Sequence, residues 1–251
     1  MMQHNFLRTL CAGLMALLII ADPAQAQQTA ADKAAAKQLV REVLQENPEL
    51  LMEALDNLRK KMEAGDPAAA REGLGKLRKE LERDPDTYIA GNPDGDVTIV
   101  EFFDYRCGYC KRAQPILQQL LKNDGGIRLA LKEFPILGPD SALASRAAIA
   151  ALKSPKYEGF HNALMRAQGP LGEDRILRIA AEAGLDSAAL RKDMDDPKIE
   201  SIISRNHEIA RSLNISGTPS FIIGDTLVPG FVELEQLQEL VAAARKQCLT
   251  C

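Results

Sequence analysis

The pattern of apolar and polar positions divides the chain into two differently built parts. Between residues 27 and 88, apolar residues recur at spacings of three and four along otherwise charged segments, as in Leu74, Leu77 and Leu81. That spacing places them on one narrow stripe of an α-helix. From residue 89 to 251, short apolar runs alternate with helical patterns. The first part therefore predicts amphipathic helices, and the second an α/β domain.

Two breaks divide the N-terminal pattern. One is Asn47-Pro48, and the other is Gly65-Asp66-Pro67, where Asp66 is placed to cap a helix that starts at Pro67. We expect two or three short helices rather than one coiled coil. A region of about 60 residues with few bulky aromatics buries little surface alone. It either docks on the main domain or assembles copies of the chain, and we favour the oligomerisation region.

The second part predicts a sheet with a helical insertion between its strands. Two turn-rich segments, 84–86 and 91–96, mark the boundary. Asp140, Asp186 and Asp196 are candidate N-caps within the insertion, and Gly184 is a candidate helix stop. The predicted strands are Val97–Phe103, Ile127–Phe134, Ser220–Ile223 and Thr226–Val228; the predicted helical segments are Lys111–Lys122, the insertion 139–213, and Val232–Lys246.

The first 26 residues read as a secretory signal peptide. Arg8 precedes the apolar stretch Leu10–Ala21, and Ala24-Gln25-Ala26 forms a small-x-small cleavage site. The alternative is a membrane anchor, but a bilayer span needs roughly 20 apolar residues. We expect an exported protein cleaved after Ala26. The net charge of −4 is unchanged by the cleavage and gives no basic footprint for nucleic acid.

Cleavage would leave four of the five cysteines, because Cys11 lies in the signal. The four form two C-x-x-C pairs, Cys107/Cys110 and Cys248/Cys251. An exported protein meets an oxidising compartment, where paired cysteines indicate disulfide structure or disulfide chemistry.

Cys107 and Cys110 lie where a predicted strand runs into a predicted helix. A helix N-terminus stabilises a thiolate, so Cys107 is the candidate nucleophile. Cys110, one turn further on, is placed to resolve a mixed disulfide. The alternatives are a structural disulfide or half a zinc site; the second pair is much further away than the roughly 15–20 residues usual for zinc.

Three further positions are candidates around this motif. Thr218-Pro219 precedes a strand, where proline can hold a cis bond and leave the Thr218 backbone free to pair with a substrate. Glu101 could relay the proton of Cys110 if it is buried, or it could simply face solvent. Asp104 and Arg106 are expected to face solvent or to form the substrate rim.

The histidines and the C-terminal cysteine pair give weaker indications of a functional site. His4 lies in the signal, and His161 and His207 are expected to be ordinary helix-surface residues. Cys248 and Cys251 could form a terminal disulfide, an auxiliary redox relay or a soft-metal site, with the disulfide preferred. We predict no cofactor and no resident metal.

Several of these motifs together resemble the DsbA-like periplasmic disulfide oxidoreductases. The resemblance rests on Glu101–Tyr105, the Cys107–Cys110 motif and Gly217-Thr218-Pro219, and covers about residues 88–247. It implies a thioredoxin fold, Cys107 as nucleophile, Cys110 as resolving thiol, Glu101 as buried acid and a cis-Pro loop at Thr218-Pro219. The helical extension is similar to the subgroup of the suppressor-of-copper-sensitivity protein C and the Com1-like proteins.

One departure bears on the activity. Strongly oxidising members of the family carry Pro-His between the cysteines, whereas this chain has Gly108-Tyr109, which with Thr218 is similar to disulfide isomerases of the DsbC kind. A less oxidising couple is therefore expected. We place Gly108, Tyr109, Thr218 and Pro219 at the substrate. Some relatives trimerise through an N-terminal helical extension, so residues 27–88 are expected to build a homo-oligomer, with a trimer as one form.

The resulting prediction is a periplasmic disulfide isomerase or reductase that acts on exported proteins with cysteines. A membrane thiol–disulfide partner would keep it reduced. Two alternatives stay open: a monomeric dithiol oxidase of the DsbA type, and a periplasmic protein that binds copper or another metal through its thiols.

Overall fold

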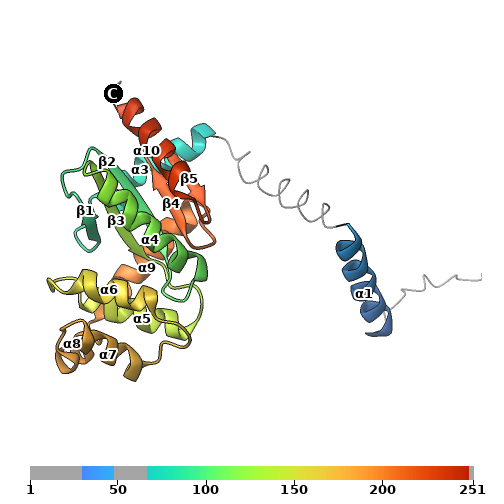
Figure 1. Ribbon diagram of the computed structural model, residues 1–251, viewed down its shortest axis with the longest axis horizontal. Helices are drawn as coiled ribbons and strands as arrows, with labels where there is room; N and C mark the ends of the chain where they lie inside the picture. Colours follow the sequence, from blue (N-terminus) through green and yellow to red (C-terminus); the bar gives the residue numbers. More distant parts are fainter. Residues whose placement is uncertain (1–29, 48–66, 249–251) are drawn as a thin grey trace, which may run out of the picture. The chain divides into compact units, whose positions relative to one another are not determined.

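The computed structural model describes residues 30–47 and 67–248 (Figure 1). The predicted signal peptide, His4, Cys11 and Cys251 lie outside these residues, as does the side chain of Cys248. The described residues belong to two compact units, which are treated separately below: helix α1, and residues 67–248.

Helix α1 spans Ala30–Glu46 and ends directly before the predicted break at Asn47-Pro48. The residue before a proline avoids helical geometry, which explains the stop. The side-chain amide of Asn47 donates to the Val43 carbonyl at 3.0 Å and closes the last turn. The larger apolar side chains of α1 are all exposed: Leu39, Val40, Val43 and Leu44.

The second unit is built on one five-stranded sheet in the order β1-β3-β2-β4-β5 (Figure 1). β2 and β3 run parallel, and the other neighbours are antiparallel. The strands are β1 Tyr88–Gly91, β2 Val97–Phe103, β3 Ile127–Glu133, β4 Ser220–Ile223 and β5 Thr226–Pro229. Four of them match predicted strands; β1 lies largely between the two turn-rich segments and was not predicted.

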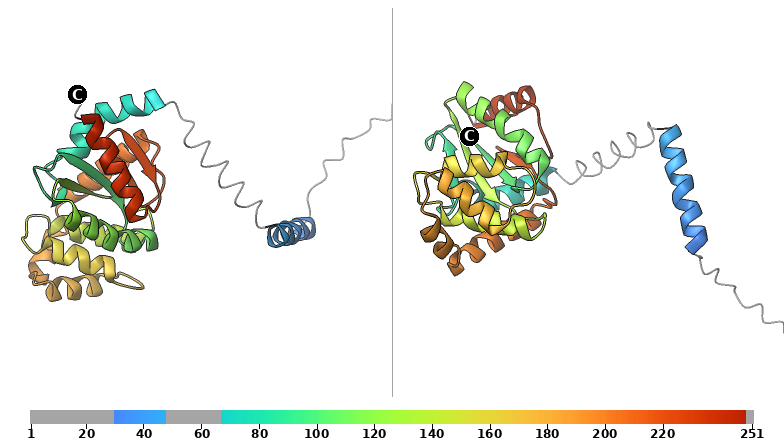
Figure 2. Two further views of the ribbon diagram at one scale, coloured as in Figure 1. Left: turned by 45° about the horizontal axis from the view of Figure 1, so that its top comes forward. Right: turned by 60° about the horizontal axis from the view of Figure 1, so that its bottom comes forward.

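The helices of this unit cover both faces of the sheet. α4 and α10 pack on one face, and α3 and α9 on the other. The insertion helices α5–α8 lie together beside α4 (Figures 1 and 2). The helices are α3 Pro67–Glu82, α4 Gly108–Asn123, α5 Pro139–Ala150, α6 Tyr157–Arg166, α7 Glu173–Glu182, α8 Ser187–Asp193, α9 Pro197–Ser212 and α10 Leu234–Cys248.

Helix α3 belongs to the sheet-bearing unit, which differs from the predicted boundary at residue 88. The unit that contains the sheet begins at Glu63. Leu74 and Leu81 of α3 are buried in the core on the α9 side of the sheet. The apolar stripe of α3, which predicted a separate N-terminal region, is therefore part of the core of the sheet-bearing unit.

Three of the four capping predictions that fall on described residues are confirmed; the predicted cap Asp66 lies outside those residues. Asp186 and Asp196 cap α8 and α9 with their carboxylates, and Gly184, at φ +85°, follows the end of α7. The prediction for Asp140 is wrong, because Gly138 is the N-cap and Pro139 starts α5. The Asp140 carboxylate instead accepts from the backbone N–H of Leu171 at 2.9 Å.

Candidate active site

Cys107 is the N-cap of α4, directly after the turn that follows β2. Its backbone is extended, and its sulfur accepts a hydrogen bond from the backbone N–H of Cys110 at 3.3 Å. Cys110 lies one turn into the helix and is completely buried, whereas Cys107 retains a small exposed edge. The two thiols therefore meet, and the sulfur of Cys107 is the one that reaches the surface.

The two thiols of the motif have opposite acidities. The pKa of Cys107 is lowered to about 6, chiefly because the Cys110 thiol donates to its sulfur and backbone N–H groups at the helix start add to this. The pKa of Cys110 is raised, first by burial and then by its bond to Cys107 and the charge of Glu101. At neutral pH, Cys107 is the thiolate and Cys110 keeps its proton.

The loop before β4 lies against Cys107. The peptide bond Thr218–Pro219 is cis, as the sequence suggested. In the protonated state, the Cys107 thiol donates to the Thr218 carbonyl at 3.2 Å. The Pro219 carbonyl is held by the backbone N–H of Gly230 at 2.8 Å. In the described part of the chain, the Thr218 N–H has no hydrogen-bond partner, so it is available to an extended peptide.

Glu101 is completely buried in β2, which excludes the alternative of a solvent-facing residue. Neither carboxyl oxygen has a hydrogen-bond partner among the described residues. Burial, with the nearby charge of Cys107, raises the pKa of Glu101 to about 8. A carboxyl that titrates near neutral pH beside a buried thiol can accept and return a proton.

The two residues between the cysteines differ in exposure. A Cβ built on Gly108 would meet nothing within 4 Å, so the space above this position is open. Tyr109 is 58% exposed. The Arg112 guanidinium lies 5.5 Å from the centre of the Tyr109 ring and 4.5 Å from that of Phe231. The rim of the site is thus aromatic and cationic on this side.

Asp104 is buried, so the expectation of a solvent-facing residue was wrong. Its carboxylate accepts from the backbone N–H of Arg106 at 2.7 Å and from the Ser141 hydroxyl at 2.7 Å. The backbone N–H groups of Ile136 and Leu137 add two more bonds, at 2.8 and 3.0 Å. These bonds offset the cost of burying a charge. Arg106 itself is exposed at the rim, as expected.

His161 is also buried, which corrects the expectation of a surface histidine. Its Nδ1 is 2.9 Å from the Tyr105 hydroxyl, and that hydroxyl donates to Glu133 at 3.1 Å. Burial lowers the pKa of His161 to about 3 and raises that of Glu133 to about 8. The network lies behind the turn that carries Cys107. No spacing in the sequence joins these residues, so sequence reasoning missed them. His207 is only partly buried and packs on Phe134.

Within residues 30–47 and 67–248, no group of three or more His, Cys, Asp or Glu side chains is arranged to hold a metal ion. Over the same residues, no helix combines the length and apolar character that crossing a membrane requires.

Two family models match the chain. The model described as DSBA-like thioredoxin domain matches residues 98–242, and the model described as copper resistance protein ScsC N-terminal domain matches residues 32–64. Since the first covers more than half of the sequence, the chain belongs to the DsbA-like thioredoxin-domain family of thiol–disulfide oxidoreductases.

Solved structures of similar proteins support this family assignment. A thioredoxin-like oxidoreductase from Silicibacter pomeroyi is 50% identical, with a TM-score of 0.66, over 67% of this chain and 98% of that one. Proteus mirabilis ScsC in a transitional conformation is 29% identical, with a TM-score of 0.65, over 87% of this chain and 99% of that one.

One curated relative is a much longer protein named as an antiporter. The Na(+)/H(+) antiporter NhaA 3 of Salinispora tropica is 28% identical over 177 residues, which is 70% of this chain but 27% of the antiporter. The chain thus spans about a quarter of the length of that relative.

Proposed function

We propose that this protein is a periplasmic thiol–disulfide isomerase and reductase that acts on exported proteins. The proposal assigns Cys107 as nucleophile, Cys110 as resolving thiol and Glu101 as proton relay. The family supplies the chemistry, and the predicted signal peptide supports export. A solved relative from Salmonella enterica is itself described as a periplasmic thioredoxin-like protein.

The first step is attack by the Cys107 thiolate on one sulfur of a substrate disulfide. A bond forms between Cys107 and that sulfur, the substrate's S–S bond breaks, and the other substrate sulfur leaves as a thiolate. The pKa of Cys107, lowered to about 6, keeps the nucleophile charged at neutral pH. The mixed disulfide is then open to two outcomes.

In isomerisation, another substrate thiolate attacks the mixed disulfide, forms the new substrate disulfide and releases the Cys107 thiolate. In reduction, the Cys110 thiolate attacks the sulfur of Cys107, the bond between Cys107 and the substrate breaks, and the substrate sulfur leaves as a thiolate. The dithiol has then given two electrons to the substrate and become the internal disulfide. Cys110 must first lose its proton, and Glu101 is placed to take it. Burial and the raised pKa of Cys110 slow this resolving step, which leaves the mixed disulfide more time to react with a second substrate thiolate.

The seat for the substrate is the cis-Pro loop and the exposed dipeptide. An extended segment can pair with the backbone of Thr218 while Pro219 holds the loop against Cys107. Gly108 leaves room for the incoming chain, and Tyr109 offers an exposed ring. Neither contact reads a defined side chain, which suits an enzyme that must accept many misfolded proteins.

The observation that favours an isomerase rather than a monomeric oxidase is the exposed apolar stripe of α1. A helix that leaves Leu39, Val40, Val43 and Leu44 in solvent needs a partner surface. We propose that copies of the chain supply it, which would bring several active sites to one substrate. A membrane thiol–disulfide partner would return the dithiol to its reduced state.

The test is refolding of a scrambled-disulfide protein in glutathione buffer by the full mature chain, residues 27–251. We expect the unaltered protein to assemble and to restore native disulfides. Leu39→Glu with Val43→Glu should leave it monomeric, still able to reduce a small disulfide, but without isomerase activity.

The matched control is Arg41→Gln with Gln45→Glu, which changes the net charge by the same amount on the opposite side of α1. It should assemble and isomerise like the unaltered chain. If the Leu39 and Val43 variant isomerised normally, α1 would have no part in the activity. If the unaltered chain failed to isomerise but oxidised a dithiol peptide, it would be an oxidase.

A further inference from the structure

We infer that a cationic pocket between α6 and α7 binds acidic segments of the substrate polypeptide. The pocket has a volume of about 420 Å³ and is open to solvent. Its charged lining consists of Arg166, Arg175, Arg178 and Glu182, and alanine and isoleucine side chains form the rest. This inference rests on the proposed function, because it names a class of substrate for the same site.

The three arginines are not neutralised by the protein. Among the side chains that the structure describes, no carboxylate lies within 4.0 Å of Arg166, Arg175 or Arg178. Six other described arginines have a carboxylate within 4.0 Å: Arg78, Arg106, Arg146, Arg191, Arg205 and Arg245. Other described arginines also lack an ion pair, but the hollow lined by α5, α9 and Pro135 gathers only two arginines, against three in this pocket. A protein with net charge −4 thus gathers three arginines in one pocket whose only carboxylate, Glu182, forms no ion pair with them.

One of the three is already held in place. The Arg175 guanidinium donates to the carbonyl of Pro170 at 2.9 Å and also to that of Gln168. Carbonyls orient the side chain but leave its positive charge uncompensated. An arginine fixed in this way loses little conformational entropy when it binds a carboxylate, and its planar group can form two parallel hydrogen bonds.

The pocket is connected to the active site through Lys111, the residue after Cys110. The Lys111 ammonium donates to the Ala167 carbonyl, and Ala167 also lines the pocket. Side chains of α4 and α6 are joined further along by Gln114 and Asn162, at 2.6 Å. The C-terminal end of α6 therefore lies beside the N-terminal end of α4, where Cys107 is. A chain seated at Cys107 can continue into the pocket.

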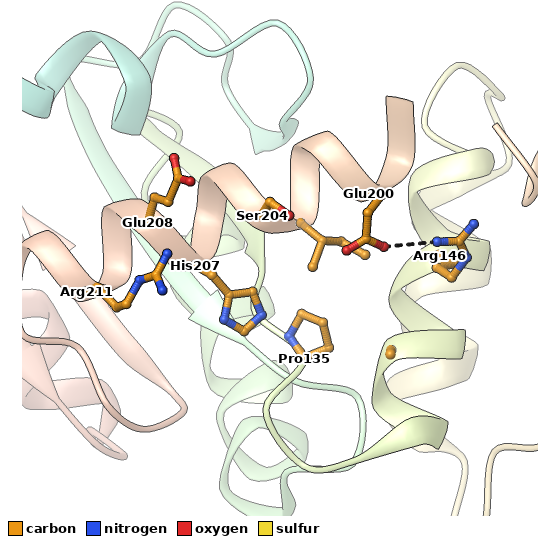
Figure 3. Close-up of a pocket in the computed structure, with 9 residues that line it drawn as sticks. Pro135, Arg146, Glu200, Ser204, His207, Glu208 and Arg211 are labelled. Atoms are coloured by element: carbon orange, nitrogen blue, oxygen red, sulfur yellow. Dashed lines mark hydrogen bonds and ion pairs between the residues drawn. The ribbon is translucent and has the colours of Figure 1, made fainter. Parts of the chain in front are cut away.

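A second hollow on the same unit shows that arginines alone do not make such a site. It is lined by residues of α5, α9 and Pro135 (Figure 3). There Arg146 pairs with Glu200 at 3.2 Å, and Glu208 lies on the same wall as Arg211 (Figure 3). Because its two arginines are matched by two glutamates, whereas the α6–α7 pocket has three arginines and one glutamate, this hollow offers no net attraction to an acidic segment.

The ligand that fits the α6–α7 pocket is a run of Asp or Glu near the reacting cysteine. The experiment compares two disulfide-containing peptides that differ only in four Glu or four Gln placed beyond the cysteine. Reduction by the full mature chain in low salt should be about five- to tenfold faster for the Glu peptide, which is what a few partly exposed ion pairs supply. The advantage should shrink as salt is added.

The variant Arg166→Gln with Arg178→Gln should bring the two rates together without slowing the Gln peptide. Arg211→Gln, which removes an arginine from the other hollow, is the control and should keep the full preference. If the Arg166 and Arg178 variant still reduced the Glu peptide faster, by the same factor as the unaltered protein, the inference would be overturned.

A second measurement separates this inference from the proposed function. Binding of a fluorescent Glu-rich peptide without cysteine is followed by anisotropy, and should weaken about fivefold or more in the Arg166 and Arg178 variant. If neither peptide were reduced, the proposed function would fail, and this binding result would still decide the pocket. Unchanged binding in the variant would count against the pocket.

Discussion

Helices α1 and α3 carry the same kind of apolar stripe and use it differently. In α3, Leu74 and Leu81 are buried in the core on the α9 side of the sheet. In α1, Leu39 is 62% exposed and Val40 is 58% exposed. A stripe of three-and-four spacing therefore predicts a helix with one apolar face, but not whether that face is buried within the same chain.

The polar contacts of the two helices differ in the same way. α3 is tied to distant parts of its unit: Arg78 pairs with Asp225, and the buried ammonium of Lys132 donates to the Glu80 carbonyl at 2.7 Å. The described contacts of α1 are local, such as Gln38 to Glu42 at 3.2 Å. A truncation meant to remove only the assembly region should therefore start after α1 and keep α3. The predictions below test how separable the two regions are.

The largest expected effect is on chemistry alone. Cys107→Ser replaces the thiolate with a hydroxyl that is not ionised at neutral pH, so thiol–disulfide exchange should fall by at least about 10³-fold. The oligomeric state, measured by light scattering, should not change. A change of assembly in this variant would show that the two regions are coupled.

The next effect compares the two stripes directly. Leu81→Ala removes a fully packed side chain and should lower the free energy of unfolding by about 3 kcal/mol. Leu44→Ala, in the exposed stripe of α1, should change the unfolding of the sheet-bearing unit by less than about 0.5 kcal/mol. Urea denaturation followed by circular dichroism measures both. Equal losses would mean that α1 is part of the same cooperative unit.

A smaller effect concerns the buried acid. Glu101 has its pKa raised to about 8 by burial, so the folded state binds a proton that the unfolded state releases above about pH 4.5. Stability is therefore lost as the pH rises from about 4.5 to 8, and Glu101→Gln should stabilise the protein by about 2–3 kcal/mol at pH 7. At pH 4 the two proteins should unfold alike.

Glu101→Gln should also slow the attack of Cys110 on the mixed disulfide at Cys107, because the Cys110 thiol loses its proton acceptor. Stopped-flow release of a substrate thiol measures this step. The assembly through α1 should be unaffected. A Glu101→Gln protein that is less stable than the original at pH 7 would contradict the burial argument.

The smallest effect is a pH profile. Alkylation of Cys107 by iodoacetamide should follow its thiolate, with a midpoint near pH 6 and about a tenfold fall for each unit below it. The depressed pKa also stabilises the reduced protein at high pH, and that contribution is lost as the pH falls through about 6. Leu39→Glu with Val43→Glu should leave the midpoint unchanged; a shift would link α1 to the active site.

Much of the fold follows from short-range patterns. The strand Val97–Phe103 was predicted with its observed bounds, because a continuous apolar run next to turn residues has few other solutions. Asp186 and Asp196 were recognised as caps because a cap depends on residues two or three positions away. Strand β1 was missed, since its four residues gain strand geometry only by pairing with β3.

The features of the active site also differ in whether they depend on nearby or on distant residues. The sequence alone determined the reactive motif, because the acidity of Cys107 depends on the first turn of its own helix. Only the tertiary structure decided which polar groups lie behind it. Asp104 and His161 could be buried because Ser141 and Tyr105, 37 and 56 residues away from them, supply hydrogen bonds. Burial of a polar group depends on such distant partners, and a sequence pattern read over a few residues does not contain them.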